Sequence, residues 1–185
     1  MQQADSIRFQ AVVLVHLDAA HNLARWLLRN PTEAEDVVQE AMLRAFSYFP
    51  SFRGVNARAW LLQIVRNAAY ATLRKTQGVH MVPLREDTDD TDRFDKAVEL
   101  VDPADDPEVQ LLRGEAHRQV DVLLGRLPLE LRECVVLREL EDLSYKDIAE
   151  ITAVPIGTVM SRLWRARRLL SEVAMAGEMA QEPAR

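Results

Sequence analysis

The sequence is short of cysteine, glycine-rich loops and long apolar runs, and each shortage excludes a class of protein. Cys134 is the single cysteine among 185 residues, so no internal disulfide can form, and the four histidines are scattered without metal-ligand spacing. No phosphate-binding glycine loop and no paired nucleophile and base are present, so we expect neither an enzyme nor a bound cofactor or metal. No run approaches the ~20 apolar residues that span a membrane, and the N-terminus lacks the order of a signal peptide. These absences predict a soluble cytoplasmic protein without membrane insertion.

What the sequence does contain is enough hydrophobic residues for a core, arranged at helical spacing with almost no strand pattern. The net charge of −6 is local, because eleven acidic and three basic side chains lie between Arg85 and Glu108, which leaves +2 on the rest of the chain. Prolines also interrupt this acidic part of the chain. We therefore predict an all-α fold with a helical domain at 1–76, an acidic flexible linker at 77–107, a second helical domain at 108–172 and a tail at 173–185.

In the first domain the apolar spacing predicts a small bundle of helices, over residues 7–28, 32–49 and 57–75. Asn30 and Pro31 interrupt the first helix, and Thr32 with Glu35 three residues later is typical of a capping box at the start of the second. The third helix carries four basic residues and no acidic one. Trp60 is expected to pack in the core, because it lies beside apolar positions of that helix.

In the second domain the sequence predicts a helix-turn-helix. Ser144, with Asp147 three residues on, caps a short helix, and Pro155 suits the first turn of the next one. Ala153 lies in the turn, where a non-glycine residue in the left-handed conformation costs about 1 kcal/mol. The stretch 154–170 has four arginines and no acid, and its apolar residues recur at helical spacing. Such a basic helix suits DNA, because phosphates and base edges need cations and directed donors.

Two stretches carry a family resemblance. The segment "LSYKDIAEITAVPIGTVMSRLWRARRLL" resembles region 4 of bacterial sigma-70 factors. The segment "NPTEAEDVVQEAMLRAFSYFPSFRG", followed by "ARAWLLQIVRNAAYATLRK", resembles region 2. In this order, across a linker, they resemble an extracytoplasmic-function (ECF, group IV) sigma factor. The resemblance implies a region 2 bundle of three to four helices and a region 4 helix-turn-helix. It also implies a factor that directs promoter-specific transcription initiation under anti-sigma control.

The resemblance implies three sets of site residues and their partners. Core RNA polymerase would be bound through the clamp helices of its largest subunit and the flap of its second-largest subunit. The residues placed against the clamp helices are Glu35, Asp36, Gln39 and Glu40. The residues placed against the minus-ten element of promoter DNA are Phe52, Arg53, Asn56, Arg66, Asn67 and Arg74. The residues placed against the minus-thirty-five element are Gly157, Thr158, Met160, Ser161, Arg162 and Arg165. Relatives often have lysine or arginine at position 160, so Met160 predicts an altered promoter preference.

Two other functions remain open from the sequence. A stand-alone helix-turn-helix regulator would account for the second domain but would leave the first one unassigned, and it would normally bind palindromic sites as a dimer. A sigma-mimicking antagonist would sequester an anti-sigma factor without touching DNA, and its basic reading faces should then be degraded, whereas here they are intact.

Overall fold

The computed structural model describes residues 3–77 and 120–181, and all regular structure in these ranges is helical. The N-terminal lobe contains α1 (Gln3–Val12), η1 (Leu14–His16), α2 (Leu17–Leu28), α3 (Pro31–Tyr48), η2 (Phe49–Ser51) and α4 (Ala57–Gln77). The C-terminal lobe contains a helical stretch at 120–125, then α6 (Leu129–Val135), the π-helical η3 (Val136–Leu140), α7 (Tyr145–Thr152) and α8 (Ile156–Gln181). The all-α prediction is therefore confirmed. The predicted linker lies outside the described residues except at its first residue, and the predicted start of the tail at 173 falls inside α8.

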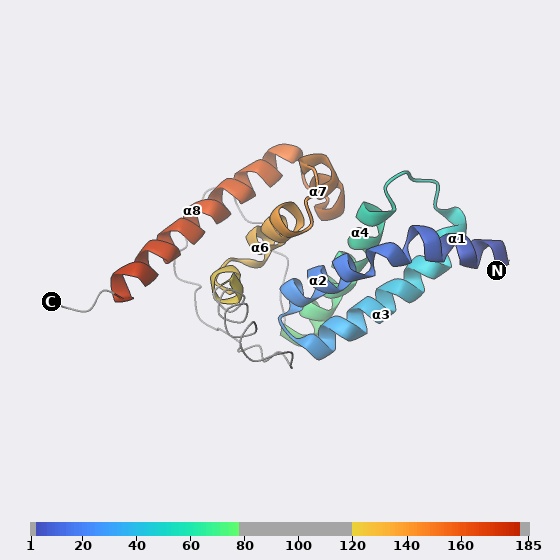
Figure 1. The fold of residues 1–185 in the computed structure, drawn as a ribbon, viewed down its shortest axis with the longest axis horizontal. Helices are drawn as coiled ribbons and strands as arrows, with labels where there is room; N and C mark the ends of the chain where they lie inside the picture. The colour runs from blue at the N-terminus through green and yellow to red at the C-terminus, as the bar shows by residue number, and fades with distance from the viewer. Residues whose placement is uncertain (1–2, 78–119, 182–185) are drawn as a thin grey trace, which may run out of the picture.

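In the N-terminal lobe, α2, α3 and α4 pack against one another as a bundle (Figure 1). Each helix presents a stripe of buried residues, in which alanines let the backbones approach and larger side chains fill the centre. Leu23, Leu61 and Phe49 are among the fully buried large side chains. This bundle fixes the direction of α3 and α4, the two helices that carry most of the predicted site residues in this lobe.

The first predicted helix is broken in the structure. The chain leaves α1 at Val12, makes the short turn η1 and re-enters a helix at Leu17, although no proline or glycine interrupts the pattern. Phe9 lies edge-on against Phe46 and Phe49, with ring centroids 5.1 and 5.3 Å apart, and Val13 is completely buried. Tertiary packing of these side chains has therefore overridden an uninterrupted local helical preference.

The C-terminal lobe is built around the predicted helix-turn-helix. Ser144 and Asp147 form the predicted capping box at the start of α7, and Ala153 ends it in the left-handed conformation with φ 56°. Val159, Leu163 and Ala166 are buried and hold α8 against α6 and α7. Because these three residues fix the rotation of α8, the side chains of Arg167 and Arg168 are exposed on its outer face.

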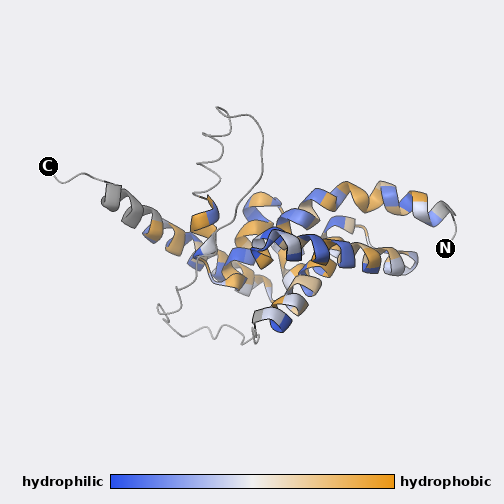
Figure 2. Cartoon of the chain, turned by 90° about the horizontal axis from the view of Figure 1, so that it is seen from below, coloured by the Kyte–Doolittle hydropathy of each residue, from blue (hydrophilic) through white to orange (hydrophobic). Residues whose placement is uncertain are grey.

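The two lobes lie against each other. Helix α4 packs on α7, and α2 packs on α6, so that the buried apolar residues of both lobes form one continuous cluster. Figure 1 shows the N-terminal bundle and the C-terminal helices side by side, with the long α8 running outward to the C-terminus. Hydrophobic and hydrophilic residues alternate along several of the helices in Figure 2, which is the pattern of helices that are covered on one face.

Candidate nucleic-acid interface

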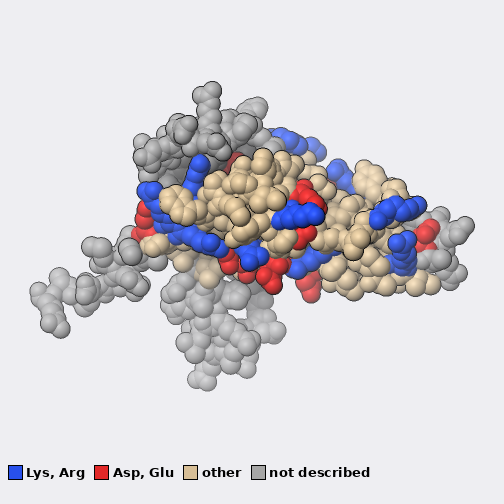
Figure 3. All heavy atoms as spheres, turned by 90° about the horizontal axis from the view of Figure 1, so that it is seen from above, with Lys and Arg blue, Asp and Glu red and all other residues tan. Residues whose placement is uncertain are grey.

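The first turns of α8 carry the residues predicted to read the minus-thirty-five element. Gly157 is exposed with open space around it, and Met160 is 51% exposed. Thr158 and Ser161 are half-buried, and the Ser161 hydroxyl donates to the Thr158 carbonyl at 3.0 Å. In Figure 3, basic side chains gather over the end of the molecule where α8 lies. The exposed positions and the local charge suit contact with a polyanion.

The two predicted arginines of this helix are less accessible than the sequence suggests. Arg162 and Arg165 are both half-buried. The Arg162 Nη1 nitrogen is buried and has no hydrogen-bond partner in the described part of the chain. In this conformation Arg162 therefore lies in part against its own lobe.

Sequence reasoning missed Trp164. Its side chain is 63% exposed, one helical turn after Met160, and the guanidinium of Arg168 lies 5.9 Å from its ring centroid. A tryptophan exposed to this extent on the outer face of a reading helix is an unusual placement for a large aromatic residue. The spacing of four residues from Met160 was the available signal, because residues i and i+4 share a helix face.

The residues of α4 that are predicted to contact the minus-ten element differ in their exposure to solvent. Asn67 and Arg74 are exposed, whereas Arg66 is only 7% exposed. The Arg66 Nε donates to Glu133 Oε1 at 2.7 Å, and the Tyr70 hydroxyl donates to Glu133 Oε2 at 3.1 Å. Glu133 belongs to α6 of the other lobe and is completely buried. Arg66 is thus engaged by protein in this conformation.

Burial and pairing act against each other in this cluster. Burial raises the pKa of the Glu133 carboxyl, although the neighbouring Arg66 guanidinium acts in the opposite direction. Burial opposes the charge on Arg66, but its contacts with Glu133 and Tyr70 outweigh that effect and raise the pKa of Arg66. Burial, with the adjacent Glu133, also raises the pKa of the Tyr70 hydroxyl, so Tyr70 donates its proton in this contact.

The loop before α4 holds the remaining minus-ten candidates. The Phe52 ring is 8% exposed and lies 4.6 Å from the ring of Trp60, measured between centroids. A Cβ on Gly54 would approach the Phe52 ring to 2.9 Å, so glycine allows this close packing. Arg53 donates back to the Pro50 carbonyl at 2.6 Å. Phe52 would reach a base only if this loop rearranged, and its predicted role stays a prediction.

Asn56 has two structural partners. Its Oδ1 accepts from the amide of Ala59 at 3.0 Å, which caps the start of α4, and its Nδ2 donates to Asp147 of α7 at 2.8 Å. Asp147 itself belongs to the capping box of α7. The side chain therefore joins the first turns of two helices from different lobes, which sequence reasoning did not foresee.

The predicted polymerase-binding residues share one exposed surface of α3, namely Glu35, Asp36, Gln39 and Glu40. We call this surface the acidic ridge. Glu40 pairs with Arg44 one turn later. An apolar groove runs beside the ridge, lined in part by Leu14, Met42 and Phe46. Leu43 on the same groove is 69% exposed. An apolar groove with a charged edge is typical of a protein-binding surface.

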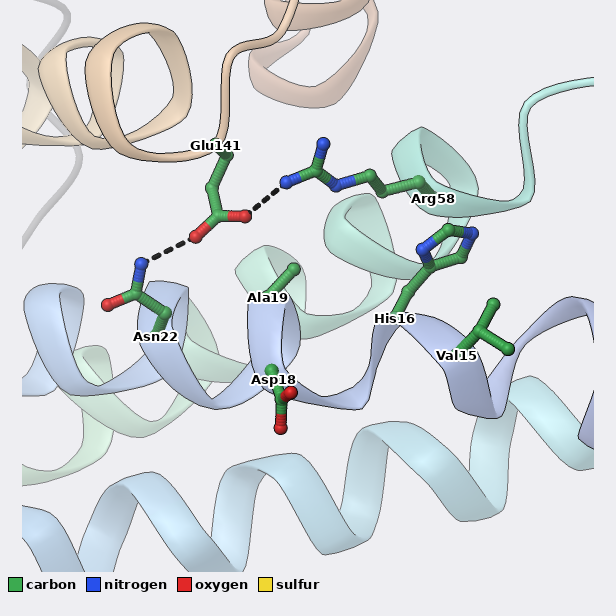
Figure 4. A pocket seen from close by; sticks show the side chains of 7 residues that line it. All are labelled: Val15, His16, Asp18, Ala19, Asn22, Arg58 and Glu141. Carbon is green, nitrogen blue, oxygen red and sulfur yellow. Dashed lines mark hydrogen bonds and ion pairs between the residues drawn. The ribbon is translucent and has the colours of Figure 1, made fainter.

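A second group of polar contacts joins the lobes beside α2. Glu141 follows η3, is only 5% exposed and accepts hydrogen bonds from Asn22 of α2 and Arg58 of α4. Figure 4 shows both side chains directed toward the Glu141 carboxylate at the edge of a small hollow. His16 lines the same hollow, and burial, together with the charge of Arg58, lowers the pKa of its imidazole. The lobes are thus joined by charged contacts at Glu133 and at Glu141.

Other kinds of site receive no support in the described residues. No cluster of three or more histidine, cysteine or acidic side chains in those ranges could hold a metal ion. No helix among those described is long and apolar enough to cross a bilayer. Cys134 is fully buried, and burial raises the pKa of its thiol to about 11. This placement is that of an unreactive core cysteine.

Comparisons with protein families match both lobes. The model of Sigma-70 region 2 matches residues 12–79, and that of Sigma-70, region 4 matches residues 117–170. The chain is 39% identical to the ECF RNA polymerase sigma-E factor of Haemophilus influenzae, over 92% of this chain and 89% of that protein. It is 34% identical to the ECF RNA polymerase sigma-E factor of Escherichia coli K12, over 92% of this chain and 88% of that protein.

Two solved structures resemble the whole chain. The first is the sigma factor RpoE in complex with the anti-sigma factor NepR from Bartonella quintana, with a TM-score of 0.69 at 28% identity, covering 91% of this chain and 97% of that one. The second is CnrH in complex with the cytosolic domain of CnrY, with a TM-score of 0.63 at 26% identity, covering 94% of each chain. Both likenesses extend over the two lobes.

Proposed function

The chain belongs to the sigma-70 family as an ECF sigma factor with region 2 and region 4 domains, and from this we propose how its surfaces divide the work of initiation. Helix α3 binds core RNA polymerase, α4 with its preceding loop engages the minus-ten element, and α8 reads the minus-thirty-five element. The observation that carries the proposal is the joint presence of an exposed acidic ridge on α3 and an exposed reading face on α8. RNA synthesis belongs to the polymerase, because sigma factors are not enzymes. The factor would act in the cytoplasm, where polymerase and chromosome meet.

The acidic ridge fits a basic helical partner. Its carboxylates attract the basic side chains of the clamp helices, and the adjacent apolar groove supplies the desolvated contact that gives affinity. Asp36→Lys with Glu40→Lys should therefore weaken co-purification with core polymerase. The control is Glu172→Lys, which reverses an exposed acid at the far end of the molecule on α8. Equal loss in both proteins would contradict the assignment of the ridge.

The reading face of α8 is tested by run-off transcription with core polymerase and fragmented genomic DNA from the source organism. New start sites should require this protein and should weaken about tenfold in Arg165→Ala, because one lost arginine contact costs about 1–3 kcal/mol. The control is Arg167→Ala, which removes the same charge from a neighbouring exposed position that pairs with Glu139. Tight sequence-specific DNA binding without polymerase, and no new starts, would favour a stand-alone regulator.

We also propose that an anti-sigma factor controls this protein, because one structural relative is a sigma factor in complex with an anti-sigma factor. Region 4 would in addition contact the flap of the second-largest polymerase subunit. A gene product that blocks run-off transcription by the purified factor, and releases it when removed, would identify the inhibitor. Transcription that no co-expressed partner reduces would contradict anti-sigma control.

A further inference from the structure

The contact between the lobes is centred on one carboxylate whose two oxygens are both used by the other lobe. Glu133 is completely buried in region 4, and its partners are Arg66 and Tyr70 of region 2. The Arg66 guanidinium also lies 4.3 Å from the centroid of the Tyr70 ring. A buried carboxylate is tolerated only when it is paired and hydrogen-bonded. In this conformation region 2 therefore satisfies a charge that region 4 carries.

A second arginine is available to the same carboxylate. Arg162 of α8 acts electrostatically on Glu133, and it belongs to the same lobe. Its Nη1 is nevertheless buried without a hydrogen-bond partner among the described residues. A buried donor left unpaired costs free energy, so this nitrogen of Arg162 would gain from an acceptor. Glu133 thus has two possible guanidinium partners and hydrogen-bonds the one in the other lobe.

Further contacts hold the interface along α4. The Gln63 Nε2 donates to the carbonyl of Glu150 in α7 at 3.1 Å, and Asn56 donates to Asp147. Asn22 and Arg58 hold Glu141 on the other side (Figure 4). Together these bonds hold α7, the first helix of the helix-turn-helix, on α4, the helix proposed to engage the minus-ten element.

This arrangement cannot read a promoter. The two promoter elements are named for positions about 25 base pairs apart, which is roughly 85 Å along B-form DNA at about 3.4 Å per base pair. Helices α4 and α7 are in hydrogen-bond contact here. Residues 78–119 connect the lobes, and a chain of that length could reach roughly 130 Å when extended. Separation of the lobes is therefore required, and the connection is long enough for it.

We propose that the chain has a closed, autoinhibited state that is stabilised by the contact of Glu133 with Arg66 and Tyr70 of region 2, and we call this contact the latch. When the lobes separate, Glu133 pairs with Arg162 instead. This proposal rests on the proposed function, which assigns α4 and α8 to promoter DNA. The exchange of one arginine partner for another keeps the carboxylate paired in both states. The free-energy difference between the closed and the separated state is therefore small, because neither state buries an unpaired carboxylate. Polymerase and promoter can shift the equilibrium by binding the separated lobes.

The first test locks the closed state. Gln63→Cys with Glu150→Cys, treated with a short bismaleimide, joins α4 to α7 where they already touch. Native Cys134 is buried, and each single variant treated alike controls for modification. The locked protein should lose run-off transcription, whereas the untreated double variant keeps it. Equal transcription by locked and unlocked protein overturns the closed state as inhibitory, while leaving the sigma assignment intact. Failure of the untreated protein and the parent chain to transcribe would instead reject the proposed function.

The second test addresses the latch itself. Tyr70→Phe keeps the buried ring and removes one hydrogen bond to Glu133, whereas Tyr48→Phe makes the same change at a residue that is 55% exposed. Removal of one hydrogen bond should shift the closed-to-open ratio about twofold to tenfold. The Tyr70→Phe protein should reach half-maximal transcription at a correspondingly lower concentration and show a larger radius of gyration in X-ray scattering. Identical behaviour of the two variants would overturn Glu133 as the latch.

Discussion

Ala153 gives a stability prediction whose sign follows from one backbone angle. The residue ends α7 in the left-handed conformation, with φ 56° and ψ 39°, and its side chain is exposed. A non-glycine residue in this conformation carries about 1–2 kcal/mol of strain. Ala153→Gly relieves that strain but gives the unfolded chain more freedom, which costs about 0.4–1 kcal/mol. The variant should therefore be more stable than the parent by about 0.5–1 kcal/mol.

Urea unfolding followed by circular dichroism measures this change. With a slope of about 2 kcal/mol per molar urea, the midpoint should rise by roughly 0.3–0.5 M. The matched control is Ala149→Gly, the same substitution one turn earlier inside α7, where glycine costs about 1 kcal/mol. The two variants should move the midpoint in opposite directions. A midpoint lowered by Ala153→Gly would refute the assigned strain in the turn.

Three further predictions concern single side chains. Trp164→Ala should weaken binding to the minus-thirty-five element roughly tenfold, which is the effect of losing one base contact. The unfolding midpoint should change little, because the ring is mostly exposed. An unchanged promoter affinity would exclude the ring as a contact. Cys134, with a pKa near 11, should resist iodoacetamide in the folded protein at neutral pH and react once urea unfolds the chain; fast labelling without urea would disprove its burial. The pKa of His16, measured by NMR, should lie below its ordinary value of 6.5. Because the unfolded state then binds the proton at a higher pH than the folded state, the contribution of His16 to stability is present above pH 6.5 and is lost as the pH falls. A pKa above 6.5 would contradict this.

The local structure of region 4 was predictable because its signals are local. The capping box of Ser144 and Asp147 and the left-handed residue at Ala153 both depend on neighbours within a few positions. The start of α3 was less well predicted. Asn30, and not Thr32, is the capping residue, since its side chain accepts from two amides of the first turn while Pro31 occupies the first helical position. The prediction of a cap at Thr32 was therefore wrong, because Asn30 is also a residue type that caps helices.

Helical spacing could not predict which of the site residues are exposed and which are buried against the other lobe. Arg66 and Tyr70 are four residues apart and therefore share one face of α4. The structure buries both residues under region 4, through Glu133, which is 67 positions away from Arg66. Periodicity reports which face of a helix leaves its own bundle, and it carries no information on a second domain that covers that face.

That Glu133 needs a cationic partner could have been predicted from the sequence. It lies among Leu131, Cys134 and Val135 in a run that is buried throughout, and a glutamate in such a run is almost never fully buried unless it is paired. The sequence could therefore have required a cationic partner for Glu133 without naming it. Arg66 in region 2 and Arg162 in region 4 both meet that requirement, and the choice between them depends on whether the lobes are together or apart. Because two arginines can pair with Glu133, its partner cannot be predicted from the sequence. For the same reason the carboxylate can stay paired in both conformations.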